Sequence, residues 1–110
     1  MLKSSLALAA FILLALSAPA SAQDIGILQG KYGFNWRSNP DRAKCVKIDG
    51  KLFDEFKSAK YKCDLKEISN TASGEKARVC SQGENKGKEY MIFATFRSCE
   101  KERKTQASNG

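Results

Sequence analysis

The chain has 110 residues, with 19 Lys and Arg against 12 Asp and Glu, and it contains no histidine. The missing imidazole excludes His-based triads, dyads and metal-ligand motifs, and we expect no catalytic residue, no metal and no cofactor. The formal net charge of +7 favours acidic partners, such as an anionic envelope polymer, lipid head groups, nucleic acid or an acidic protein.

The first 22 residues have the pattern of a secretory signal peptide. A short start that contains Lys3 precedes an apolar run of 11 residues, Leu6 to Leu16, and the small residues Ala20-Ser21-Ala22 follow. The run is shorter than the ~20 apolar residues of a membrane span, so we expect cleavage before Gln23. The sequence therefore predicts a periplasmic or secreted mature domain, 23–110, without a transmembrane segment.

The beginning of the mature domain predicts one strand, and the segments on either side of it each have two possible structures. Residues 23–30 are expected to form either a flexible arm or a first short strand. Aromatic residues then alternate with other residues at Tyr32, Phe34 and Trp36, which is typical of a strand. Turn-forming residues end this strand, and the pattern of 40–48 leaves a helix and a strand both open.

Four further elements follow from hydrophobic periodicity. Apolar residues at helical spacing predict an amphipathic helix of about ten residues from Lys51. Alternation then predicts a hairpin of two strands, 61–68 and 76–81, joined by turn-forming residues. The segment 88–96 has apolar residues on both faces, which is typical of a central strand covered on both sides.

The end of the chain predicts a last helix and completes the expected fold. Ser98 can cap this helix, and residues 106–110 are expected to fray. Strands and helices in this order predict a small, disulfide-stabilised α+β domain. We expect an antiparallel sheet of three to four strands and two short helices.

The four cysteines, an even number in a short chain with an export signal, predict two disulfides. In the predicted hairpin the apolar residues are odd-numbered, so Cys63 lies on the inner face and Cys80 on the outer face. A bond between these two would need a register slip or a bulge. We therefore expect Cys45–Cys63 with Cys80–Cys99, and the alternative is Cys45–Cys80 with Cys63–Cys99.

Two surfaces are candidate binding sites. The first is a basic face of the hairpin, formed by Lys60, Lys62, Lys66, Lys76 and Arg78. It predicts a non-enzymatic module that binds an anionic envelope component or an acidic partner, although lysines also protect sheet edges. The second is the aromatic row Tyr32, Phe34 and Trp36, which predicts a protein–protein module, such as an inhibitor or an accessory subunit of an envelope complex, unless it faces the core. A small hydrolase is a distant third.

Overall fold

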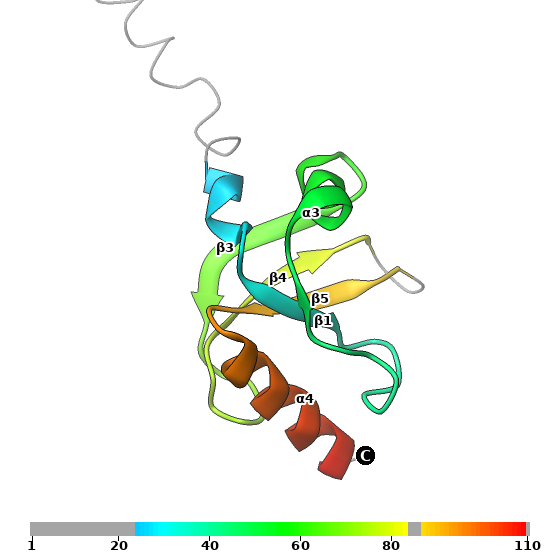
Figure 1. Ribbon diagram of the computed structural model, residues 1–110, viewed down its shortest axis with the longest axis vertical. Helices are drawn as coiled ribbons and strands as arrows, with labels where there is room; N and C mark the ends of the chain where they lie inside the picture. Colours follow the sequence, from blue (N-terminus) through cyan, green and yellow to red (C-terminus); the bar gives the residue numbers. More distant parts are fainter. Residues whose placement is uncertain (1–23, 84–86, 110) are drawn as a thin grey trace, which may run out of the picture.

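The computed structural model describes residues 24–83 and 87–109, so the predicted signal peptide lies outside the described residues. The described residues form eight elements (Figure 1). In chain order they are η1 (Ile25–Leu28), β1 (Tyr32–Asn35), β2 (Val46–Lys47), α3 (Gly50–Lys57), β3 (Lys62–Ile68), β4 (Ala77–Ser81), β5 (Glu89–Phe93) and α4 (Phe96–Asn109). Within these two ranges, no helix has the length and apolar character needed to cross a bilayer.

The strands form one antiparallel sheet in the order β2-β1-β5-β4-β3. The small α+β domain with two disulfides is confirmed, and the sheet has one strand more than the upper expected number. The segment 40–48, whose structure the sequence left open, contributes the two-residue edge strand β2. β5 lies at the centre of the sheet, as its apolar residues on both faces predict.

The helices α3 and α4 lie on opposite sides of the sheet (Figure 1). Two hydrophobic clusters fill the spaces between the layers: Phe53 and Ile92 belong to the cluster under α3, and Phe93 and Cys99 to the cluster under α4. Ile92 and Phe93 are neighbours in β5, and each is only 1% exposed. The sheet is therefore covered on both sides at its central strand.

The amphipathic pattern of α3 places its two phenylalanines against the sheet. Phe53 and Phe56 are buried, while the lysines of the helix are exposed. The Phe56 ring meets Tyr61 and Tyr90 edge-on, with centroids 4.9 and 5.3 Å away. Burial, with smaller contributions from Tyr90 and Glu55, raises the pKa of Tyr61 to about 12. This phenol therefore stays neutral and packs as part of the core.

The first element differs from the expectation for residues 23–30. Residues 25–28 form the 3-10 helix η1, and Leu28 is fully buried in the cluster under α3. The predicted arm or strand is wrong for these four residues. The sequence did not reveal the burial, because one leucine among glycines and polar residues produces no periodic pattern.

The last helix also differs from its prediction at both ends. Thr95, not Ser98, caps α4, because Thr95 Oγ1 accepts a hydrogen bond from the Ser98 N–H at 3.1 Å. The helix continues to Asn109, so residues 106–109 are helical and not a frayed tail. Gln106 contributes to this extension through a hydrogen bond of 2.7 Å from its Nε2 to Glu102.

All four cysteines form disulfides, but with another connectivity than predicted. The bonds are Cys45–Cys99, which joins the segment before β2 to α4, and Cys63–Cys80, which joins β3 to β4. The expected pairs Cys45–Cys63 and Cys80–Cys99 are wrong, and so is the alternative set. Cys63 and Cys80 are directly opposite each other in the sheet, with their Cα atoms 4.0 Å apart.

The error comes from the assignment of faces in β4. The apolar residues of both hairpin strands were assumed to share one face, but β4 is an inner strand with packing on both sides. Ala77 belongs to the cluster under α4, whereas Cys80 belongs to the cluster under α3. Cys63 and Leu65 also pack against the cluster under α3. Cys63 and Cys80 therefore share a face without any slip at that position, and the β-bulge lies farther along β3.

Candidate functional site

The structure divides the predicted basic face between the two sides of the sheet. Lys62 pairs with Ser81 on the side that α4 covers, whereas Arg78 pairs with Ile92 on the side of α3. The remaining members of the set are exposed lysines: Lys60, Lys66 and Lys76. The five cations do not form one surface, because the alternation of β3 and of β4 places their basic residues on different sides.

Arg78 is also engaged in contacts of its own. Its Nε donates a hydrogen bond of 2.8 Å to the Leu65 carbonyl, and its guanidinium lies 3.3 Å from the Glu67 carboxylate. Only 17% of the side chain is exposed. Arg78 therefore holds the irregular part of β3 against β4, and its charge is partly compensated within the hairpin.

A different group of cations does come together beside the β4–β5 hairpin. A pocket of about 340 Å³ is open to solvent there, and its lining residues are Arg37, Ala59, Lys60, Lys62, Ser81, Gln82 and Gly83. Two separate segments supply the cations: Arg37 follows β1, whereas Lys60 and Lys62 lie where the chain passes from α3 into β3. No Asp or Glu of the described residues lines this pocket.

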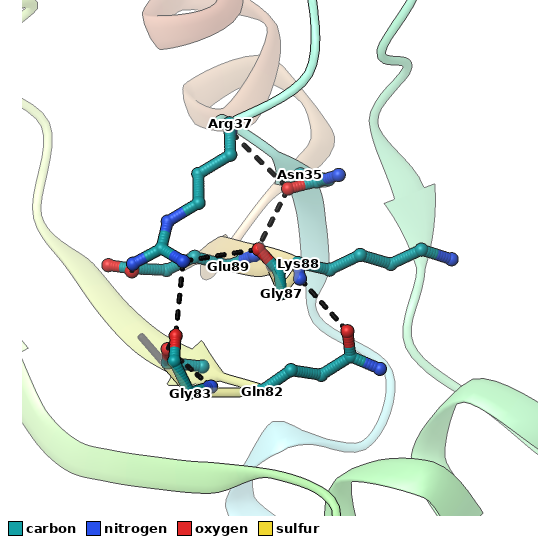
Figure 2. Close-up of polar contacts among 8 residues, drawn as sticks. Asn35, Arg37, Gln82, Gly83, Gly87, Lys88 and Glu89 are labelled. Atoms are coloured by element: carbon teal, nitrogen blue, oxygen red, sulfur yellow. Dashed lines mark hydrogen bonds and ion pairs between the residues drawn. The ribbon is translucent and has the colours of Figure 1, made fainter. Parts of the chain in front are cut away.

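Arg37 builds one wall of the pocket by fixing the hairpin (Figure 2). Its NH1 group donates hydrogen bonds of 3.1 Å to the carbonyl oxygens of Gly83 and Gly87, and NH2 donates one of 2.6 Å to Glu89. The Asn35 Oδ1 atom accepts hydrogen bonds from the backbone N–H groups of Arg37 and Glu89. A single guanidinium thus ties the end of β1 to both arms of the β4–β5 connection.

The charge balance of the pocket depends on its two lysines. Glu89 compensates the charge of Arg37 directly. None of the ion pairs between described residues includes Lys60 or Lys62, and both residues are exposed. Because each ammonium group carries three donors and no acceptor, two lysines at one pocket favour an anionic group with several oxygen atoms.

The aromatic row does not form a contact surface. Phe34 is fully buried and stacks on Phe93 with ring centroids 6.4 Å apart. Tyr32 and Trp36 are partly buried and pack against the same cluster under α4. The row is therefore mainly part of the core, which leaves little exposed aromatic surface for the predicted protein–protein contact.

Sequence reasoning identified Lys60 and Lys62 but missed Arg37. The acceptors of Arg37 lie 46 to 52 residues away along the chain, so no local motif connects them. The nearest signal is Asn35 followed by Arg37 at the end of an aromatic strand. That signal has meaning only once β1 is known to pair with β5.

The groups that line the pocket are two ammonium ions, a guanidinium, a hydroxyl and an amide, which are groups that recognise anions. Among the described residues, no group of three or more His, Cys, Asp or Glu side chains is arranged to hold a metal ion. Comparisons with protein families, with curated proteins and with solved structures find no match for this chain.

Proposed function

We propose that the chain is an exported, non-enzymatic binding module that holds an anionic group of its partner in the pocket of Arg37, Lys60 and Lys62. The carrying observation is that two exposed lysines, neither in an ion pair with a described residue, meet at a concave site whose described lining residues include no carboxylate. The partner is an anionic envelope component or an acidic protein in this proposal.

The pocket is suited to binding because its wall is fixed before a ligand arrives. The guanidinium of Arg37 holds Gly83 and Gly87 in place, and the Gln82 Oε1 atom accepts a hydrogen bond from the Lys88 N–H at 2.9 Å. A rigid site loses less conformational freedom on binding. The two lysine side chains are then the main groups that have to be immobilised by the ligand.

Two features support export. The first 22 residues have the order of a signal peptide, and the domain contains two disulfides, which persist in oxidising compartments. A periplasmic or secreted protein of this charge meets anionic polymers and lipids at the cell envelope. The proposed location and the proposed ligand class are therefore compatible.

Binding to heparin, used as a regular anionic polymer, tests the proposal. The variant Lys60→Gln/Lys62→Gln is compared with Lys44→Gln/Lys47→Gln, which removes two exposed lysines outside the pocket. We expect the pocket variant to bind about 25-fold more weakly, or about fivefold per lysine, and the control to lose much less. Calorimetry at roughly 50 and 200 mM salt measures this, because charge-driven binding weakens with salt.

Equal losses in the two double variants would overturn the proposal, because binding would then depend on total charge alone. Binding that the unmodified protein retains unchanged at the higher salt concentration would also contradict it. A circular dichroism spectrum of each variant separates loss of binding from loss of the fold. Lys60 and Lys62 are both exposed, so neither change is expected to disturb the core.

A further inference from the structure

We propose that the outer surface of α4 docks on an anionic lipid bilayer, with the Phe96 ring in the interfacial region. This outer surface consists of Phe96, Arg97, Lys101 and Lys104. It is separate from the pocket, because the pocket lies beside the start of β5 and Phe96 follows the end of that strand. In Figure 1 the helix runs along the sheet as its own layer.

Phe96 is the most exposed large hydrophobic residue among those that the structure describes. It is 50% exposed, compared with 40% for Ile27 and 40% for Val46. Its ring is held edge-on by Tyr32, with centroids 5.6 Å apart. The aromatic residue is therefore positioned at the surface, at the first residue of the helix, rather than inserted into the core.

Cations surround this ring on one side of the helix. Arg97, Lys101 and Lys104 follow one another at spacings of four and three residues, which places them on one face, and all three are exposed. Together with Phe96 and Glu100 they line a shallow groove of about 510 Å³. The face of α4 that points away from the sheet is thus both basic and locally apolar.

The acidic groups near this surface are already paired. Glu100 accepts two hydrogen bonds of 2.8 Å from Arg103, and Glu75 lies 3.2 Å from Lys101. Four cations and two carboxylates leave a local net charge of +2. Arg97 and Lys104 are exposed and take part in none of the ion pairs between described residues, although Lys104, after Arg103, contributes to the lowered pKa of Glu100.

This composition favours a lipid surface over a protein partner. Lysine is depleted from the centres of protein–protein interfaces, where several aromatic or aliphatic side chains usually pack together. Here a single ring is surrounded by Arg and Lys side chains. Their apolar methylene groups can enter the interfacial region of the bilayer with the ring, while their charged groups stay with the lipid head groups. Basic residues with one exposed phenylalanine therefore complement an anionic bilayer.

Co-sedimentation with vesicles tests the docking surface on the intact, disulfide-bonded protein. Vesicles of phosphatidylcholine with about one quarter phosphatidylglycerol are compared with pure phosphatidylcholine. We expect binding to the anionic vesicles and little to the neutral ones. Each cation near a membrane contributes about a fivefold change in affinity, so Arg97→Gln/Lys104→Gln should bind roughly 25-fold more weakly. Lys51→Gln/Lys66→Gln, which removes two exposed lysines from α3 and β3, is the charge-matched control and should lose far less.

The apolar contribution has its own pair of variants. Phe96→Ser should weaken vesicle binding about fivefold, because the variant lacks the exposed aromatic surface that the bilayer would bury. Val46→Ser, at another exposed position, should not weaken binding. Three results would overturn the proposal: equal binding to both vesicle types, equal losses in the two double variants, or no difference between Phe96→Ser and Val46→Ser. A loss confined to Lys60→Gln/Lys62→Gln would also overturn it, by assigning the lipid to the pocket.

Discussion

Glu102 is a carboxylate with only 1% of its surface exposed, and it connects α4 to the turn between β3 and β4. It accepts hydrogen bonds of 2.7 Å from the Ser73 N–H and from Gln106 Nε2. Burial by itself raises the pKa of Glu102, but these hydrogen bonds outweigh it, and the pKa lies below its ordinary value of 4.5. The ionised form is therefore the one that the folded state holds.

We predict that Glu102→Gln destabilises the protein by about 1–3 kcal/mol at neutral pH, since the amide leaves a buried partner unsatisfied. A lowered folded-state pKa means that the carboxylate stabilises the fold above pH 4.5 and loses this effect as the pH falls through its folded value. The difference in free energy of unfolding should therefore shrink at acidic pH. Urea unfolding at pH ~7 and ~3 measures it, with Asp49→Asn as control, because Asp49 is exposed and takes part in no ion pair between described residues. A difference independent of pH would contradict the prediction.

Single residues were predicted well where their role is local. The lysines of β3 were expected to be exposed, and Lys62 and Lys66 are. Arg37, by contrast, acts through acceptors that only the assembled sheet brings near it. The face of Cys80 was also missed. Alternation in a strand separates its residues into two faces, but when both faces are covered it does not show which helix each face packs against.

At the level of elements, hydrophobic periodicity was sufficient for β1, β3, β4, β5 and α3. These elements have bulky apolar residues at regular spacing, and the bounds of most of them lie close to the expected ones. The expected strand 88–96 is wrong at its end, because β5 ends at Phe93 and Phe96 begins α4. The elements that were missed or misjudged have no such pattern. η1 buries one leucine, β2 has two exposed residues, and the last turns of α4 depend on polar contacts.

The burial of the central strand β5 on both faces predicts a large loss of stability when its core residues are truncated. Ile92 and Phe93 are each 1% exposed and lie on opposite faces of β5. Replacing either by Ala should cost about 2–5 kcal/mol, the range for large-to-small changes in a core. Urea unfolding of the two variants measures this cost, and Val46→Ala on the edge strand should cost far less. A neutral Phe93→Ala would mean that α4 does not cover the sheet in solution.

At the level of the whole molecule, the sequence predicted the sign of the charge but not the place where it gathers. Lys60 and Lys62 meet Arg37 only because β1 and β4 both lie beside β5 in the sheet. Strand order depends on the sum of many contacts, and one sequence without a recognised motif does not define it. The pocket is therefore a property of the topology. The cations on the outer surface of α4, by contrast, follow from the helical spacing of Arg97, Lys101 and Lys104 in the sequence.

The two disulfides should contribute unequally to the stability of the molecule. Cys45–Cys99 closes a separation of 54 residues and Cys63–Cys80 one of 17. In the chain-entropy account these loops correspond to about 4 and about 3 kcal/mol, and a domain of this size often depends on such cross-links. Cys99 and Cys80 are both fully buried, so truncation adds a cavity in either variant and loop length is the difference between them. We therefore predict that Cys45→Ala/Cys99→Ala unfolds at a lower urea concentration than Cys63→Ala/Cys80→Ala. If the second variant is the less stable one, the β3–β4 hairpin depends on its cross-link more than the docking of α4 does, and loop length is not the deciding factor.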